Sequence, residues 1–251
     1  MGIGDELMAA GQARQAMHSD PRRVQIVDRN GAPRWHPVWE NNPRIARPGE
    51  PGDFQQVRNG PGLRPYILAK SVRQWTWQPY SPTPGELVFS PAEQAWAAAQ
   101  PAPQVVIEPT LKARASPNKL WTGWREFIQR AEAAGIELTQ LAPPGTAQPR
   151  GVRLIHTPDF RHAAAVLARA RIYVGHEGGL HHAAAALGLP AVVIFGGFIG
   201  PQHTGYAGHR NLAAGGEPCG MRVPCRHCLE AMNAITPQGV MKHMKELLDA
   251  Q

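Results

Sequence analysis

The sequence predicts an α/β protein whose second half is built around a parallel, doubly wound sheet. Two observations support this prediction. From residue 104 onward, short apolar segments alternate with helical segments, which is the pattern of consecutive βαβ units. One such unit, residues 172–197, consists of an apolar strand, a glycine-rich turn, a short alanine-rich helix and a second apolar strand. Ligands of such sheets bind at the carboxyl ends of the strands.

Composition divides the chain into two parts. The 251 residues are 43% hydrophobic and 18% charged, which is typical of a globular protein with a sizeable core. Most of the 25 prolines lie in the first 150 residues, so we expect a loop-rich N-terminal half and a more regular C-terminal half. The Gln-Pro-Ala-Pro stretch at 100–103 has the composition of a linker. We therefore predict one domain over residues 1–100 and a second over residues 104–251.

The positive charge of the chain suits an anionic partner. The formal net charge of +7 favours a nucleotide, a phosphorylated glycolipid, a membrane surface or a nucleic acid as ligand. The basic residues are scattered, and no run of five occurs. A broad electropositive cleft is therefore favoured over a dedicated nucleic-acid-binding arm.

Cysteine use and the first residues predict the compartment. Three cysteines, an odd number, argue against a disulfide framework and favour a reducing compartment. Asp5 and Glu6 stand where a signal peptide would carry basic and then apolar residues. Glycine and proline interrupt the uncharged run at 183–200, so we expect no transmembrane segment. The protein is predicted to be cytoplasmic, with peripheral association at the inner face of the membrane as a second option.

Local signals predict few regular elements in the N-terminal half. Asp5 is favoured in the first turn of a helix that extends to about Met17. Ser90 followed by Pro91 predicts the start of a second helix, which ends near residue 99. Apolar runs predict strands at 24–27, 66–69 and 86–90. Five aromatic residues either pack the core of this half or line a sugar-binding cleft, and core packing is the better interpretation: Trp35, Trp39, Trp75, Trp77 and Tyr80.

Strands and helices alternate in the C-terminal half. Apolar segments predict strands at 104–108, 136–141, 152–155, 172–175, 191–195 and 211–212. Between and after them, amphipathic spacing and capping residues predict helices at 119–134, 157–170, 180–187 and 237–250.

The glycine-rich turn is the best candidate for a ligand site. Gly178 and Gly179 allow the backbone to approach a ligand, and the helix that follows directs free N–H groups toward it. A diphosphate is the natural ligand of such a turn. Glu177 and the His181–His182 pair add an acceptor and two titratable imidazoles. An ordinary strand–helix turn with solvated histidines fits the same residues, because a Gly-Gly turn alone is a weak signal.

The three cysteines form a candidate metal site. Five residues separate Cys219 from Cys225, and two residues separate Cys225 from Cys228. A pair with the second spacing can chelate zinc or iron, and Cys219 adds a third thiolate. His227 lies between the last two cysteines, and a histidine or a second subunit would have to supply the fourth ligand. Three free, partly buried thiols are the other interpretation.

Three short sequence stretches follow one another along the chain. They are Gly4-Asp5, then Lys119-Leu120-Trp121, then Val-Gly-His-Glu-Gly-Gly-Leu-His-His-Ala-Ala-Ala at 174–185 with Gly-Leu-Pro at 188–190. These stretches resemble the motifs of glycosyltransferase family 9, the ADP-heptose heptosyltransferase-like enzymes of the GT-B superfamily. The resemblance is strongest from about residue 104 to the C-terminus, and the stretch at 174–185 is its most specific part.

The resemblance implies a fold and a set of roles. It implies a GT-B-like fold, in which two Rossmann-like domains face each other across a cleft, with the N-terminal domain reduced in this chain. Asp5 matches the general base that deprotonates the acceptor hydroxyl, and Lys119 matches the lysine that neutralises the donor phosphate. The candidate donor-binding positions are Lys119, Glu177, Gly178, Gly179 and His182, to which Lys112 of the preceding polar loop is added as a further cation.

The implied activity is transfer of a heptose- or hexose-type sugar from a nucleoside-diphosphate sugar to an acceptor hydroxyl. The resemblance also implies inversion at the anomeric carbon, catalysis without a metal, and a glycan or glycolipid acceptor. Glu177 and Gly178 replace the more usual Asp and Thr, and the N-terminal domain is shorter than family members normally carry. Two alternatives follow from these departures and from the charge: a nucleotide-sugar-binding protein without turnover, or a transferase acting on nucleic acid or protein.

Overall fold

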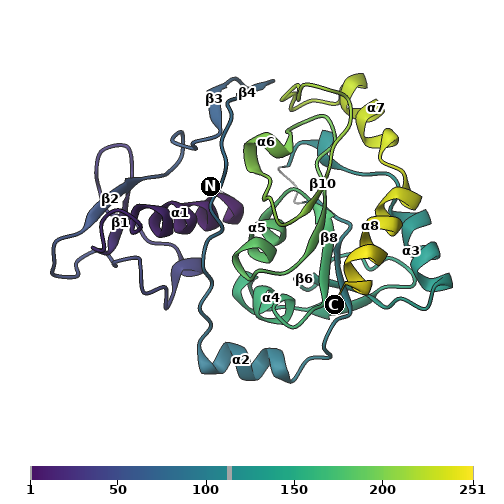
Figure 1. Cartoon of the computed structure of the whole chain (residues 1–251), viewed down its shortest axis with the longest axis horizontal. Helices are drawn as coiled ribbons and strands as arrows, with labels where there is room; N and C mark the ends of the chain where they lie inside the picture. The colour runs from purple at the N-terminus through teal and green to yellow at the C-terminus, as the bar shows by residue number, and fades with distance from the viewer. Residues whose placement is uncertain (1, 112–114, 251) are drawn as a thin grey trace.

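Two unequal parts make up the structure, a computed structural model that describes residues 2–111 and 115–250. A smaller N-terminal region extends away from a larger C-terminal region along the long axis of the molecule (Figure 1). Helix α2 (Pro91–Ala98) lies in the connection between them. We call residues 2–100 the N-terminal region and residues 104–250 the C-terminal region; that each is a domain of its own stays a prediction.

A six-stranded parallel sheet forms the centre of the C-terminal region. Its strands lie in the order β10-β9-β8-β5-β6-β7. The first strand of this region, β5, therefore lies beside the fourth, β8, and the chain winds outward from this pair in both directions. This is the order of a dinucleotide-binding sheet, with the topological switch point between β5 and β8. The strands are β5 (Val105–Glu108), β6 (Leu138–Ala142), β7 (Arg153–His156), β8 (Ile172–His176), β9 (Ala191–Ile194) and β10 (Arg210–Leu212).

Helices cover both faces of this sheet. Neighbouring residues of a strand point to opposite faces, and those of β5 belong to two different cores. Val105 and Ile107 pack with α3 and α8, whereas Val106 packs with α1, α4 and α5. The predicted doubly wound sheet is thus confirmed (Figure 1). The helices are α1 (Ile3–Ala16), α3 (Trp124–Ala133), α4 (Phe160–Leu167), α5 (Gly179–Ala186), α6 (Pro201–Thr204), α7 (Arg226–Ala234) and α8 (Pro237–Asp249), with a 3₁₀ turn η2 (Pro117–Lys119) before α3.

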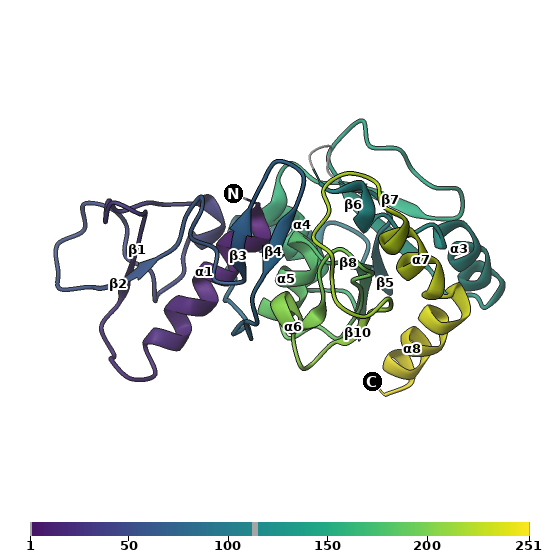
Figure 2. The ribbon, with the colours of Figure 1, turned by 90° about the horizontal axis from the view of Figure 1, so that it is seen from above.

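The N-terminal region is reduced to one long helix and two small sheets. Strands β1 (Val24–Val27) and β2 (Gln55–Arg58) pair in parallel, and β3 (Ile67–Lys70) and β4 (Trp75–Trp77) form an antiparallel hairpin. A 3₁₀ turn, η1 (Pro37–Trp39), packs against α1. Helix α1 also packs on α5, so the core of the N-terminal region is continuous with one core of the C-terminal region. The hairpin lies beside the start of α1 (Figure 2).

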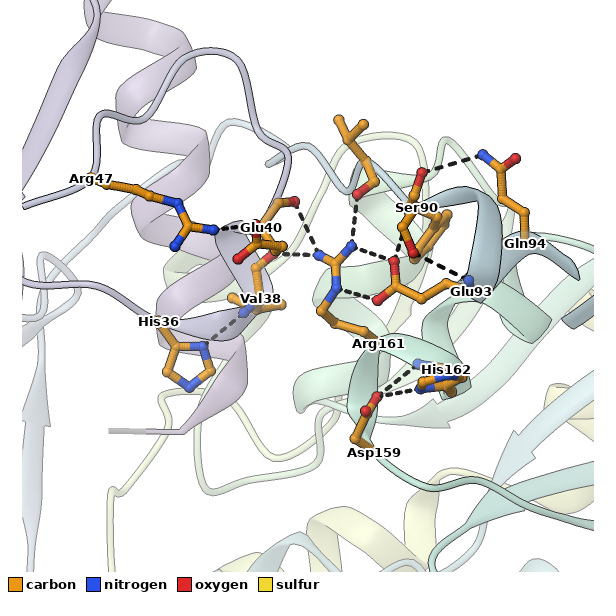
Figure 3. Close-up of polar contacts among 12 residues, drawn as sticks. His36, Val38, Glu40, Arg47, Ser90, Glu93, Gln94, Asp159, Arg161 and His162 are labelled. Atoms are coloured by element: carbon orange, nitrogen blue, oxygen red, sulfur yellow. Dashed lines mark hydrogen bonds and ion pairs between the residues drawn. The ribbon is translucent and has the colours of Figure 1, made fainter. Parts of the chain in front are cut away.

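Arg161 of α4 fastens the two regions together (Figure 3). Its side chain is buried and forms two bonds with the Glu93 carboxylate of α2, at 2.5 and 2.7 Å. The same guanidinium donates to the carbonyl oxygens of Val38, Glu40 and Val88, at 3.3, 3.2 and 2.7 Å. Although burial favours the neutral acid, the hydrogen bonds of Arg161 lower the pKa of Glu93 from 4.5 to about 2. A single buried cation thus joins three segments of the N-terminal region to α4.

One predicted strand, at 86–90, is wrong. The segment is extended but pairs with no strand in the described part of the chain. Instead it passes closely along α1, where a Cβ on Gly85 would lie 2.5 Å from the Leu7 carbonyl oxygen. Its own carbonyl groups accept hydrogen bonds from side chains, such as Asn42 to Glu86. An apolar segment can therefore be extended and partly buried without belonging to a sheet.

The start of the helix predicted at 119–134 is also wrong. Lys119 ends η2, and α3 begins only at Trp124. The backbone N–H of Trp121 donates to the ring of His176 at 3.0 Å, so the segment between the two helices is held by a distant strand end. Strands β2 and β4 and helices α6 and α7 were not predicted.

Candidate functional site

A cavity of about 830 Å³ lies at the switch point of the sheet, between the two regions. One side, which we call the sheet wall, is built by the ends of β5 and β8, by η2 and by the start of α5. The other side, the hairpin wall, is built by the start of α1 and by β3 and β4. Six predicted site residues line this one cavity: Asp5, Lys119, Glu177, Gly178, Gly179 and His182. Lys112 lies outside the described residues.

A buried charge network forms the centre of the sheet wall. Glu177 follows the last residue of β8, and its carboxylate is ion-paired with Lys119. Its other oxygen lies 3.4 Å from Nε2 of His182. Burial favours the neutral acid, but the charge of Lys119 and the contact with His182 hold the pKa of Glu177 well below its usual range. The Glu177 carboxylate therefore stays charged at neutral pH.

The backbone next to this pair offers hydrogen-bond donors to the cavity. Helix α5 begins at Gly179, and an α-helix leaves the N–H groups of its first turn without partners inside the helix. Gly178, which precedes it, also lines the cavity, and a Cβ there would lie 3.7 Å from Glu108. Because N–H groups and helix dipole both favour negative charge, the sheet wall can bind an anion between Lys119 and α5.

The two adjacent histidines are buried and differ in position. His182 lines the cavity, and its Nδ1 lies 2.9 Å from the hydroxyl of Tyr206. His181 is fully buried behind it, packed against Phe195 and Tyr206. Burial and the neighbouring His182 hold the pKa of His181 well below its usual range, so its ring is neutral. The alternative of a turn with solvated histidines is therefore wrong.

Asp5 lies on the hairpin wall, in the first turn of α1. Its Oδ2 accepts the Gly2 N–H at 2.9 Å and pairs with Arg64 at 2.9 Å, while its Oδ1 accepts the Tyr66 hydroxyl at 2.6 Å. Burial and the charge of Asp5 raise the pKa of Tyr66 well above its usual range, so the phenol stays a donor. Gly4 explains how α1 reaches this place, since a Cβ there would lie 2.4 Å from the His182 ring.

Three cations that the sequence did not single out complete the hairpin wall. Arg64, Lys70 and Arg222 all line the cavity, and each lies over the ring of Trp75, at 5.5, 4.8 and 4.9 Å from its centroid. Burial and the nearby Arg64 lower the pKa of Lys70. The three positions are far apart in the sequence, so no local run of charge indicates them. Of the five aromatic residues, Trp39 is core, whereas Trp75 and Trp77 line the cavity.

Two further buried residues support the sheet wall. His176 ends β8, and its Nε2 accepts from the Trp121 backbone and from the Trp124 indole, at 3.0 and 3.3 Å. Burial, with the charge of Lys119, lowers its pKa to about 3, so the ring is neutral and its Nε2 can accept. Tyr173 donates to the Glu108 carboxylate at 2.7 Å and holds it at the edge of the cavity. Both residues hold neighbouring groups in place by hydrogen bonds, and neither was predicted.

The three cysteines lie outside this cavity, in a segment that we call the cysteine loop (residues 219–228). Cys219 and Cys225 are partly buried, and Cys228 is fully buried. Their sulfur atoms and a ring nitrogen of His227 all lie within 4.8 Å of one another. The donor set suits a transition-metal ion, because thiolate and imidazole are the preferred ligands of zinc and also bind iron.

The sequence profile of glycosyltransferase family 9 (heptosyltransferase) matches residues 72–234, which is more than half of the chain. The chain belongs to this family. The predicted family and the transferase class that comes with it are thereby confirmed. No protein in the curated set matches the chain.

Solved structures show the same fold at low identity. The fold is similar to that of a family 9 glycosyltransferase from Veillonella parvula, with a TM-score of 0.66, 13% identity, and coverage of 100% of this chain and 96% of that one. It is also similar to TibC, an iron-containing dodecameric glycosyltransferase of enterotoxigenic E. coli, with a TM-score of 0.63, 16% identity and coverage of 100% and 74%. These likenesses confirm the predicted GT-B-like fold class.

A third solved structure is matched over only part of its length. E. coli ADP-heptose lipopolysaccharide heptosyltransferase II matches with a TM-score of 0.50 and 18% identity, over 65% of this chain and 53% of that chain. The matched part thus spans about half the length of that enzyme. Among the described residues, no helix combines the length and the apolar character needed to cross a membrane.

Proposed function

We propose that the protein transfers a sugar from a nucleoside-diphosphate sugar to an acceptor hydroxyl, with inversion at the anomeric carbon. The observation that carries this proposal is the cavity at the switch point. It places an anion-binding sheet wall, with Lys119 and the start of α5, opposite a carboxylate, Asp5, on the hairpin wall. Membership of glycosyltransferase family 9 supports the same reaction class.

The donor diphosphate is proposed to bind at the sheet wall. Lys119 and the N–H groups at the start of α5 would compensate the charge that develops on the leaving diphosphate. These groups supply positive charge without a divalent metal ion, which is why we propose metal-independent catalysis. Glu177 would keep Lys119 in place, and Glu177 and Glu108 both line the cavity beside it. Gly178 and Gly179 would let the diphosphate approach the backbone.

Asp5 is proposed to be the general base. A carboxylate offers about four lone-pair positions, and Gly2, Arg64 and Tyr66 occupy three of those of Asp5. The remaining position is on Oδ1, which receives one of the three bonds. The acceptor hydroxyl would give its proton to this oxygen while its own oxygen forms the bond to the anomeric carbon. The bond from that carbon to the diphosphate breaks, and attack from the opposite face inverts the configuration.

The acceptor is proposed to be a glycan or glycolipid that carries an anionic group. Arg64, Lys70 and Arg222 surround Trp75 beside Asp5, so an acceptor with a phosphate or carboxylate next to its reacting hydroxyl would be bound there. An indole face such as that of Trp77 gives a sugar ring a surface to pack on. The localisation in the cytoplasm, with peripheral membrane association, stays a prediction.

A donor and acceptor screen tests this function. The purified protein is incubated with a panel of nucleoside-diphosphate sugars, alone and with a phosphorylated glycolipid, a neutral oligosaccharide, a peptide or DNA. We expect release of nucleoside diphosphate, stimulated most strongly by the phosphorylated glycolipid. Tight donor binding without release under any condition would instead identify a binding protein without turnover. Transfer to peptide or DNA alone would contradict the proposed acceptor.

A further inference from the structure

The cysteine loop gathers four metal-ligating atoms that the proposed reaction does not use. The Sγ atoms of Cys219 and Cys225 lie 3.7 Å apart, and those of Cys219 and Cys228 lie 3.1 Å apart. Both separations exceed the roughly 2.05 Å of a disulfide bond. Nδ1 of His227 lies 4.0 Å from Sγ of Cys228. The donor set is thus three thiols and one imidazole on a single short loop.

The orientation of His227 is fixed by the backbone. Its Nε2 lies 2.7 Å from the carbonyl oxygen of Gly215. A carbonyl oxygen only accepts, so Nε2 carries the proton and Nδ1 presents a lone pair toward the three sulfur atoms. A carbonyl that holds the second ring nitrogen is the usual support of a metal-binding histidine. A Cβ on Gly197 would lie 3.0 Å from Nδ1, so the end of β9 packs tightly against the ring.

Backbone N–H groups are directed at the sulfur atoms. The N–H of Met221 donates to Sγ of Cys219 at 3.5 Å, and that of Cys228 donates to Sγ of Cys225 at 3.4 Å. Donors of this kind stabilise a thiolate, which is the form of cysteine that binds a metal. The ligand atoms of a tetrahedral zinc site lie about 3.5 to 3.8 Å apart, given Zn–S and Zn–N bonds of about 2.3 and 2.0 Å. The observed separations of 3.1, 3.7 and 4.0 Å bracket that range.

We propose that Cys219, Cys225, Cys228 and His227 bind one metal ion, with zinc as the expected occupant, and that this ion fixes the loop joining the two walls of the cavity. Three thiolates and one imidazole are a closed set, which is typical of a structural zinc site. The inference goes beyond the proposed sugar transfer and does not depend on it, because metal content is measured without any substrate.

The cysteine loop contacts the hairpin wall through its backbone. The N–H of Trp75 donates to the Gly220 carbonyl at 3.0 Å, and the N–H of Arg222 donates to the Arg73 carbonyl at 2.8 Å. The Gln74 side chain donates to the Cys219 carbonyl at 2.9 Å. The loop therefore continues the hairpin as an additional, irregular strand. It also carries Arg222, one of the three cations that surround Trp75.

The same loop contacts the sheet wall through Asn118, the residue before Lys119. The buried Asn118 amide donates to the carbonyls of Met221 and Val223, both at 2.7 Å, and its oxygen accepts the Cys225 N–H at 3.2 Å. An ion held at Cys219 and Cys225 would thus restrain the hairpin and the Lys119 turn together. Loss of the ion should loosen both walls and leave the rest of the fold in place.

Elemental analysis of untagged protein, purified without chelator, tests the site. We expect about one zinc per chain, because four ligands close a tetrahedral site. Cys228→Ser and His227→Gln should lose most of it, whereas His156→Gln, which changes an exposed histidine on β7, should retain it. Stoichiometric iron lost in the same variants would support the site and overturn zinc as its occupant. Metal-free protein with three freely reactive thiols, or a Cys219–Cys228 disulfide, would overturn the site.

Hydrogen exchange of the wild-type chain, before and after removal of the metal by a chelator, tests its role without relying on variants that fail to fold. Amides at 73–77, 117–121 and 219–223 should exchange at least about tenfold faster in the metal-free protein, because these segments would open locally. Amides of β1 and β2 should not change, and added metal should restore protection. Uniform exchange along the chain, or no change near the loop, would overturn the proposed coupling of the two walls.

Discussion

The two walls of the cavity are built in different ways. The sheet wall consists of side chains and backbone at the ends of β5 and β8, which are adjacent strands of a buried parallel sheet. The hairpin wall consists of one helix start and a two-stranded hairpin, and the cysteine loop is attached to it by an isolated bridge and backbone hydrogen bonds. The first depends on topology, and the second depends on individual ion pairs and backbone contacts.

This difference indicates where the site tolerates change. Glu177 and Gly179 closely follow β8, a strand whose register is fixed by burial on both faces, and Lys119 ends η2 and is ion-paired with Glu177. Asp5 is placed by the packing of α1 on α5, and Arg161 fastens the remainder of the N-terminal region. We expect the hairpin wall to be the one that single substitutions displace, while the sheet wall survives them. The following predictions test this contrast, from the largest expected effect to the smallest.

Removal of the Arg161 side chain should separate the two regions. Arg161→Met leaves the Glu93 carboxylate and three carbonyl oxygens without their shared donor. Removing one partner of a buried ion pair costs about 3–5 kcal/mol, and we expect a loss of this size in the free energy of unfolding by urea. Arg130→Met is the matched control, because Arg130 pairs with Glu126 on an exposed helix face, where a pair contributes about 0.5 kcal/mol. Equal effects of the two substitutions would contradict the account.

A methyl group at Gly4 should push α1 away from α5. The Cβ of Gly4→Ala would lie 2.4 Å from the buried His182 ring, which has little room to move. Overpacking of this kind costs about 1–3 kcal/mol and should also lower turnover, because Asp5 follows directly. Gly208→Ala is the control, since a Cβ there meets nothing within 4 Å. Both quantities are measured by thermal unfolding and by initial rates. If Gly4→Ala behaves like Gly208→Ala, close packing of α1 is not what positions Asp5.

Two groups, one in each region, should lose their contributions to stability in different pH ranges. Burial lowers the pKa of His209, in the C-terminal region, from 6.5 to about 4. The unfolded chain binds this proton first, so the stability that neutral His209 contributes is present above pH 6.5 and is lost as the pH falls toward 4. Glu93, with its pKa lowered from 4.5 to about 2, loses its contribution only below pH 4.5.

Urea unfolding between pH 6.5 and 4.5 measures this difference. In the wild type, the unfolding free energy should fall as the pH decreases, because unfolding takes up the proton of His209. His209→Gln removes this proton uptake and should make the slope smaller by about 1 kcal/mol per pH unit. Glu93→Gln should leave the slope in this range unchanged. An unchanged slope in His209→Gln would contradict the burial of that imidazole. A flatter slope in Glu93→Gln would contradict the lowered pKa of Glu93.

Local patterns in the sequence predict the sheet wall well. The strands at 105–108 and 172–176 and the turn at Gly178-Gly179 follow from apolar runs and glycine alone, and their adjacency follows from the alternation of strands and helices. Six of the predicted site residues accordingly meet in one cavity. Their chemical roles stay predictions.

The hairpin wall depends on contacts between distant residues and is therefore harder to predict. Arg64 and Lys70 meet Arg222 only because the cysteine loop pairs with β4. The helix expected at residue 119 begins later because His176, on a distant strand, accepts the Trp121 N–H. His227 adjoins the cysteines in sequence, but its suitability as a ligand depends on the Gly215 carbonyl. Each of these features requires the folded chain.

The central claim is that the hairpin wall supplies the general base and the sheet wall binds the diphosphate. Parallel measurements on Asp5→Asn and Lys119→Ala test it most directly. Calorimetry gives the Kd of the nucleoside diphosphate, and initial rates give kcat. Asp53→Asn and Lys242→Ala, on exposed side chains, are the controls, and Lys119→Arg checks that a cation restores binding. Asp5→Asn should lower kcat at least about 100-fold and leave Kd within about threefold. Lys119→Ala should raise Kd about tenfold or more, because it removes a charged hydrogen bond. Near-normal turnover in Asp5→Asn, or unchanged binding in Lys119→Ala, would contradict the account.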